Sequence, residues 1–306
     1  AEIPPLPGPI AALGHTHPLL GRIVRPQDGQ PLTSAQLAHL AASHGFVLLG
    51  EKHDNPDHHR LQAWVIEALV ALGRRPAIAM EMLDADQVAA LAAYRAKPGA
   101  DAAGLGAALD WSARGWPDWA MYAPIAEIAL RANLSIIPAN LTRPATRTIG
   151  RGGLDALEPP LRDTMAASPR FDAAQSASLA DELRTSHCGK LPDSAVPRMS
   201  DVQWARDAQM AAALRDAVQA GAAASAVLIA GAGHVRTDRA VPWHLRQIAP
   251  LQKTLSVAFV EVSEGWNEPK EYGLSGRFDI IWFTARVDDQ DPCTKFEGGL
   301  RRLRHP

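Results

Sequence analysis

The stretch FVLLGEKHDNPDHHRLQ, residues 46–62, joins an apolar run to a dense group of charged and imidazole side chains. FVLLG is too apolar for a surface strand, which predicts a strand buried on both faces of a parallel sheet. Pro56 stands where a helix can begin, and a helical pattern of apolar residues continues from there to Gly73. The stretch therefore predicts a strand followed by a helix, with Glu51 and His53 at the carboxyl end of the strand.

The same alternation of strand and helix continues along the chain. Apolar runs predict buried strands at residues 76–82, 134–140 and 225–234, each next to a helical pattern, and two closing strands at 254–262 and 277–285. Such an alternation predicts an α/β fold with a mostly parallel central sheet and helices on both faces.

The chain length of 306 residues and an apolar fraction of 47% predict one α/β domain over residues 1–306. Residues 144–200 interrupt the alternation with several Pro and Gly residues and short amphipathic pieces. They predict a helical insertion or lid within that domain, around 144–200. Cys188 and Cys293 allow either one disulfide or two unpaired thiols, and the sequence leaves both readings open.

The charge and hydropathy of the chain limit its partners. A formal net charge of −2 gives no reason to expect nucleic acid or a membrane surface as the main partner. No window approaches 18 uninterrupted apolar residues, so no membrane-spanning helix is predicted. The first residues, AEIPPLPGPI, are typical of a mature protein after removal of a signal sequence, although a chain cut at an arbitrary point would look the same.

Polar side chains stand at the carboxyl ends of four predicted strands. In a parallel sheet ligands bind beyond these ends, so we expect the side chains to form one shared site. They are Glu51, His53, Glu81, Asn140 and His234. Asn140 taken alone is more typical of a solvated or supporting residue.

Two carboxylates and two imidazoles, from Glu51, His53, Glu81 and His234, suit a zinc, iron or manganese ion. They also suit general acid–base chemistry, because a neighbouring carboxylate raises the basicity of a histidine. A metal-dependent hydrolase is therefore one interpretation of the set. The GAGH segment is too short for a dinucleotide fingerprint, and no Gly-x-Ser-x-Gly element is present, which argues against NAD and against a serine nucleophile.

Other candidates lie near this predicted site. His58 and His59 are adjacent in the first turn of a helix and point about 100° apart, so we expect at most one to face the site and the other to be solvated. His187, beside Cys188 in a polar loop, is either a ligand that reaches over the site or an exposed loop residue. Tyr122 is interpreted as a core residue, with a wall position or a phenolate ligand as alternatives.

The chain resembles the ChaN-like haem-binding uptake proteins in HPLLGRIV, VLLGEKHDNPDHHRLQ, AIAMEML, RDAQMA and IAGAGHVRTDRAVP. The resemblance runs over nearly the whole chain. The wider group includes Tiki-type metalloproteases and erythromycin-esterase-like enzymes, which share two Gly-x-x-His elements and an intervening Glu. Here these fall on Gly50 to His53, on Glu81, and on Gly231 to His234.

This resemblance implies haem as the ligand and a role in bacterial haem and iron acquisition. It implies a periplasmic or outer-membrane-associated protein, commonly a lipoprotein, with the outer-membrane haem-uptake machinery as a possible partner and a possible homodimer around haem. Haem requires an axial ligand, an apolar wall and cations for its propionates. The candidate residues for haem are His53, His187, His234, Tyr122, Arg143 and Lys190. The hydrolase reading of Glu51, His53, Glu81 and His234 remains the alternative.

Overall fold

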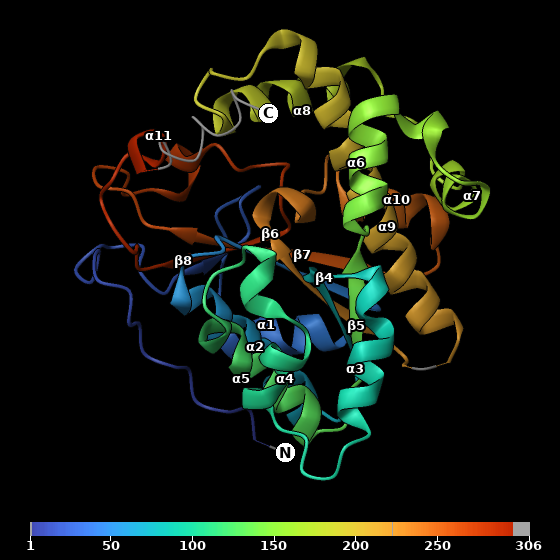
Figure 1. Ribbon diagram of the computed structural model, residues 1–306. Coiled ribbons are helices and arrows are strands. Elements are labelled where there is room, and N and C mark those ends of the chain that lie inside the picture. The colour runs from blue at the N-terminus through green and yellow to red at the C-terminus, as the bar shows by residue number, and fades with distance from the viewer. Residues whose placement is uncertain (1, 222, 296–306) are drawn as a thin grey trace.

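A computed structural model of the chain describes residues 2–221 and 223–295 (Figure 1). Its centre is an eight-stranded sheet in the order β2-β1-β8-β7-β3-β6-β4-β5. The strands are β1 Ile23–Val24, β2 Pro31–Leu32, β3 Phe46–Glu51, β4 Ala77–Asp84, β5 Ile136–Asn140, β6 Ala226–Gly231, β7 Thr254–Glu261 and β8 Ile280–Thr284. Strands β3 to β8 pair in parallel, and the short β1 and β2 add an antiparallel edge. The predicted α/β fold with a mostly parallel sheet is therefore confirmed.

Helices cover both faces of the sheet. The α-helices are α1 Ser34–Ala42, α2 Pro56–Ala71, α3 Val88–Arg95, α4 Ala102–Ala108, α5 Trp119–Arg131, α6 Arg143–Gly152, α7 Pro159–Ala166, α8 Ala173–Ser186, α9 Val196–Gln219, α10 Val241–Ile248 and α11 Pro292–Lys295. Short 3-10 segments are η1 Ala85–Gln87, η2 Trp111–Arg114, η3 Leu154–Ala156, η4 Asp193–Ala195, η5 Ala232–Val235 and η6 Pro269–Tyr272. No described helix has both the length and the apolarity needed to cross a membrane.

The two faces of the sheet follow from the alternation of side chains along each strand. In β3, Val47 and Leu49 pack with α1, α2 and α5 in one core, whereas Phe46 and Leu48 pack with α9 and α10 in the other. Successive residues of a strand point to opposite faces, so a strand with apolar residues throughout is buried on both. This is the burial that the FVLLG run predicted.

The region around 144–200 is helical, as expected. Helices α6, α7 and α8 lie beyond the carboxyl ends of the strands (Figure 1). Helices α6 and α7 form a separate small core with α9, in which Ile149, Leu157 and Met165 pack with Trp204 and its neighbours. The long helix α9 begins at Val196, and Pro197 fits its first turn.

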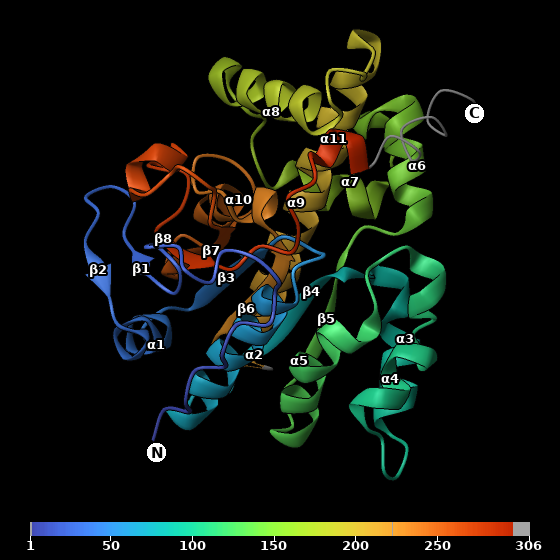
Figure 2. The same ribbon diagram turned by 90° about the vertical axis from the view of Figure 1, so that its left-hand side faces the viewer.

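A disulfide joins Cys188, just after α8, to Cys293 in α11. The bridge spans 105 residues of sequence and holds the loop after α8 next to α11, which follows β8 (Figure 2). The two readings that the sequence left open are thereby decided in favour of the bridge.

Candidate functional site

Glu51, at the end of β3, is buried and surrounded by donors. The hydroxyl of Tyr122 donates to its Oε1 at 2.8 Å, and Nδ1 of His53 donates to the same oxygen at 2.8 Å. Its Oε2 forms an ion pair with Nδ1 of His59 at 3.1 Å, at an angle too oblique for a hydrogen bond. Burial alone would raise the pKa of Glu51, but His59 and His53 hold that pKa well below its usual range. Glu51 is therefore a carboxylate anion.

His53 is oriented by Glu51, and its other ring nitrogen, Nε2, lies on the side of Gly231 and Glu81. Its side chain is 37% exposed, and the edge of Trp116 lies against it with ring centroids 5.1 Å apart. Among the residues that the structure describes, none makes a hydrogen bond to Nε2. Burial lowers the pKa of His53, but the hydrogen bond to Glu51 and the charge of Glu81 raise it above its usual value. The hydrogen bond from Nδ1 to Glu51 orients the ring, and a neutral ring in this orientation carries its lone pair on Nε2.

The neighbouring histidines His58 and His59 are both fully buried, so the expectation that one of them is solvated is wrong. His58 accepts from the amide of Lys52 at 2.8 Å and donates to Thr284 at 2.8 Å. Burial, assisted by the charge of His59, lowers the pKa of His58 to about 3, so its ring is neutral. Both histidines are buried by tertiary contacts, because Thr284 of β8 contacts His58 and Tyr122 of α5 packs against His59.

His59 has acceptors at both ring nitrogens. Nδ1 faces Glu51, and Nε2 donates to the carbonyl oxygen of His53 at 2.9 Å. Burial lowers the pKa of His59, but the charge of Glu51 more than offsets this and raises it above the usual value. The acceptors at both ring nitrogens favour the protonated form of His59, and that form stabilises the Glu51 carboxylate.

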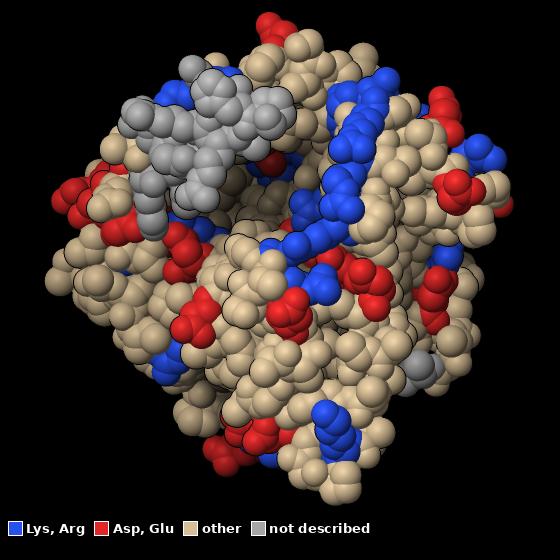
Figure 3. Space-filling view, in the orientation of Figure 1, with Lys and Arg blue, Asp and Glu red and all other residues tan. Residues whose placement is uncertain are grey.

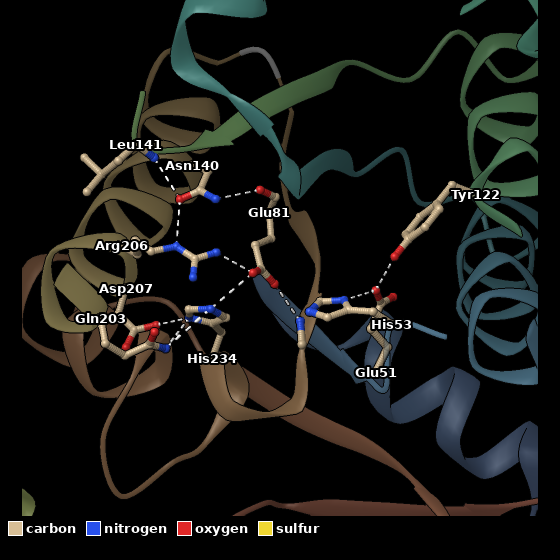
Figure 4. A network of polar contacts seen from close by, with 11 residues as sticks. Glu51, His53, Glu81, Tyr122, Asn140, Leu141, Gln203, Arg206, Asp207 and His234 are labelled. Carbon is tan, nitrogen blue, oxygen red and sulfur yellow. Dashed lines mark hydrogen bonds and ion pairs between the residues drawn. The ribbon is translucent and has the colours of Figure 1, made fainter. Parts of the chain in front are cut away.

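Glu81, from β4, is the centre of a second polar network (Figure 4). Its Oε1 accepts from Nη2 of Arg206 at 2.5 Å and lies 3.2 Å from Nε2 of His234. Its Oε2 accepts from the amide of Gly231 at 2.7 Å. Burial would raise the pKa of Glu81, but the charges of His234 and Arg206 hold it well below the usual range. Glu81, too, is an anion.

His234 lies between two carboxylates. Its Nδ1 donates to Asp207 at 2.6 Å, and its Nε2 faces Glu81. Burial would lower the pKa of His234, but the charges of Glu81 and Asp207 raise it to about 9. The ring is protonated at neutral pH, and both of its nitrogens already have partners.

The helix α9 supplies residues that sequence reasoning did not select. Gln203, Arg206 and Asp207 lie at relative positions i, i+3 and i+4, so all three lie on one face of the helix. Asp207 is 1% exposed. The adjacent charged residues Arg206 and Asp207 stand among alanines that the helical pattern predicts to be buried. Charged residues at buried helical positions are the signal that could have identified them.

Asn140 belongs to the same network. Its amide donates to the carbonyl of Glu81 at 2.9 Å, and its oxygen accepts from Nε of Arg206 at 3.1 Å. The two networks adjoin at Gly231, where an added methyl group would lie 3.0 Å from Nε2 of His53 and 3.6 Å from Oε2 of Glu81. The structure thus brings all five strand-end residues together at one edge of the sheet.

The other candidates lie elsewhere on the helices beyond this edge. His187 ends α8 and donates to the carbonyl of Leu183 at 2.7 Å. Lys190 is exposed in the loop that follows Cys188. Arg143, the first residue of α6, is exposed and donates to the carbonyl of Ala113 at 3.3 Å. Their roles toward haem stay predictions.

Within residues 2–221 and 223–295, no group of three or more His, Cys, Asp or Glu side chains is arranged to hold a metal ion. The carboxylates of the strand-end set contact cations and donors from the protein instead. A metal ion held by Glu51, His53, Glu81 and His234 remains a prediction.

Residues 37–245 match the protein family described as "Haem-binding uptake, Tiki superfamily, ChaN". The chain belongs to the ChaN family. This confirms the resemblance found in the sequence motifs. The matched range includes the strand-end residues of this ChaN-family chain and the residues of α9 that contact them.

Solved structures with this fold are distant in sequence from the ChaN-family chain. ChaN of Campylobacter jejuni, in a structure described as showing cofacial haem binding, is 20% identical, with a TM-score of 0.65 over 85% of this chain and 95% of that one. An erythromycin esterase, EreC, is 14% identical, with a TM-score of 0.48 over 89% of this chain and 99% of that one. No curated protein sequence gives a significant match. The likeness to the Campylobacter jejuni protein, at 20% identity, supports the fold alone.

Proposed function

We propose that this ChaN-family protein binds haem and serves haem or iron acquisition, with His53 as the axial ligand. The observation that carries the proposal is the state of His53: Glu51 holds Nδ1, the side chain is part-exposed, and no described residue makes a hydrogen bond to Nε2. A histidine fixed in this way by a carboxylate is the usual form of a metal-ligating imidazole. Family membership supports haem as the metal group.

Aromatic residues near His53 support the proposal. Trp116, which contacts His53, also lines a pocket of about 530 Å³ together with Trp111 and Trp119. These rings supply an apolar wall, and Arg143 contacts the same segment of chain at Ala113. Bound haem would supply a redox-active iron with a coordination position for the imidazole. His234 is a poorer ligand, because ligation would require its ring to lose a carboxylate partner.

Titration of the apoprotein with hemin, followed in the Soret region, tests this proposal. We expect saturable binding, and we expect His53→Ala to weaken it by at least about tenfold. His39→Ala is the matched control, because His39 is exposed on α1, and His187→Ala and His234→Ala test the other candidate ligands. Unsaturable adsorption of hemin by the unmodified protein would contradict the proposal that the protein binds haem. Unchanged affinity in His53→Ala would sink only the ligand assignment.

We also propose a periplasmic or outer-membrane-associated location, with the haem-uptake machinery as partner. The disulfide between Cys188 and Cys293 supports this location, since such bridges persist in oxidising compartments. Fractionation of cells that express the complete gene, with thiol labelling before lysis, tests it. Free thiols in a cytoplasmic fraction would contradict the proposal.

Acid–base hydrolysis is a second candidate, favoured by the same Glu51–His53 pair. Nε2 of His53 can accept a proton from water, and the Glu51 carboxylate would stabilise the resulting imidazolium. Ester hydrolysis that is lost in both His53→Ala and Glu51→Gln would support it. Retention of that activity in a chelator would exclude the metal-dependent form, and absence of activity on a broad ester panel would argue against the class.

A further inference from the structure

Helix α6 carries a row of arginines on one face. Arg143, Arg147 and Arg151 recur at every fourth residue, so each lies about 6 Å further along the helix axis than the one before. All three are exposed, and α6 contains no acidic residue. Figure 3 shows the row, here called the arginine ladder, as a blue band along α6. The ladder concentrates three positive charges on a chain whose net charge is −2.

The charges of the ladder are largely uncompensated. In the part of the chain that the structure describes, no side-chain partner contacts the guanidinium of Arg147 or Arg151. Arg143 has only a distant ion pair, with its Nε 4.0 Å from Asp84. The opposite face of α6 anchors the helix, because Ile149 is fully buried against α9. The helix is therefore held by its apolar side, and the ladder faces water.

The ladder begins at the candidate site. Helix α6 starts three residues after Asn140, which contacts Arg206 and Glu81. Arg143 also donates to Ala113, three residues before the tryptophan that contacts His53. In Figure 3 the band follows the rim of a hollow in this face of the molecule. The ladder thus begins close in sequence to Asn140, one of the strand-end residues, and continues along the exposed face of α6.

We propose that the arginine ladder captures the propionate carboxylates of haem and guides the porphyrin to His53, an inference that rests on the proposed haem function. Guanidinium groups pair with carboxylates through two parallel hydrogen bonds, and the two propionates of one haem match the charge of two arginines of the ladder. A row of like charges raises the local concentration of an anionic ligand, and salt screens this effect. The ladder then acts mainly on the rate of association.

Stopped-flow measurement of hemin binding tests the ladder. At low salt we expect Arg147→Glu combined with Arg151→Glu to slow association by about tenfold or more. The difference from the unmodified protein should largely disappear at high salt, while the Soret spectrum at saturation stays the same. The matched control combines Arg277→Glu with Lys253→Glu, which changes the net charge equally at exposed positions next to the amino ends of β8 and β7. It should associate at nearly the normal rate.

The outcomes separate the ladder from the proposed function. Hemin binding by the unmodified protein, with equal association rates for ladder and control variants, would overturn the ladder alone. Absence of saturable hemin binding by the unmodified protein would overturn both. A porphyrin with esterified propionates should be insensitive to the ladder variant, and equal sensitivity would contradict the proposal. Loss of binding to anionic vesicles, with hemin kinetics unchanged, would instead assign the ladder to a lipid surface.

Discussion

At the scale of single residues, the histidines of the site differ in what faces each ring nitrogen. His59 and His234 face acceptors on both sides, and His234 is a cation. His58 is neutral. Among the described residues, His53 alone of the four has no hydrogen-bond partner at its second ring nitrogen. The pairing of His234 with Asp207 and the donation from Tyr122 to Glu51 could not be predicted, because Asp207 and Tyr122 come from helices distant in the sequence. The importance of Glu51 and His53 could be predicted from their place at a strand end.

The glycine at the junction of the two networks gives a sharp test of where the ligand binds. Gly231→Ala is permitted by the backbone, since Gly231 has a φ of −59°, but its methyl group would lie 3.0 Å from Nε2 of His53. We expect hemin affinity to fall by about tenfold as the ring is displaced, and stability to fall by about 1 kcal/mol. Gly8→Ala, where an added methyl contacts nothing within 4 Å, is the control. Equal affinities for the two variants would place the ligand away from His53.

The charge of His234 predicts how stability depends on pH. Its pKa in the folded protein, about 9, is above the ordinary value of 6.5, so the protonated ring stabilises the fold. That contribution is complete below about pH 6.5 and is lost as the pH rises toward 9, by roughly 2 to 3 kcal/mol. Urea unfolding from pH 6 to 10 should therefore show a steeper loss in the unmodified protein than in His234→Gln. Parallel curves for the two would contradict a charged His234.

At the scale of elements, the strands were predictable and the chemistry of the helices was not. The run at 46–50 became most of β3, and the run at 76–82 covers most of β4, which continues to Asp84. The runs at 134–140 and 225–234 contain β5 and β6. Long apolar runs specify buried strands locally, which is why these predictions succeeded. The contribution of α9 depends on which side of the helix faces the sheet edge, and that is decided by packing against residues far away in the sequence.

The contact between α8 and the segment after β6 is a further test at this scale. Glu182 of α8 pairs with Arg236 at 2.7 Å and with Arg239, whose side chain is only 1% exposed. Glu182→Ala leaves Arg239 buried without this carboxylate, and we expect a loss of roughly 2 to 4 kcal/mol in unfolding free energy. Combining it with Arg239→Met should restore part of the loss. A double variant less stable than Glu182→Ala would show that Arg239 has another partner.

At the scale of the whole molecule, one edge of the sheet collects residues from β3, β4, β5, β6, α5 and α9. The rule that ligands bind beyond the carboxyl ends of parallel strands predicted that edge. It could not predict that most of its charges neutralise one another, because pairing depends on side-chain geometry and not on strand order. Among the described histidines of this edge, His53 has a part-exposed side chain and no hydrogen bond at Nε2, which is why the proposed function assigns the ligand to it.

The disulfide connects this edge to the end of the described chain and makes a prediction for the molecule as a whole. It closes a loop of 105 residues, and a crosslink over such a loop stabilises a fold by about 3 to 5 kcal/mol through the unfolded state. Reductant should therefore lower the urea midpoint of the unmodified protein. Cys188→Ser combined with Cys293→Ser should start at the lower midpoint and show no response to reductant. If reductant shifts both proteins equally, or neither, the bridge does not stabilise the fold, and the support that it gives to an oxidising location is withdrawn.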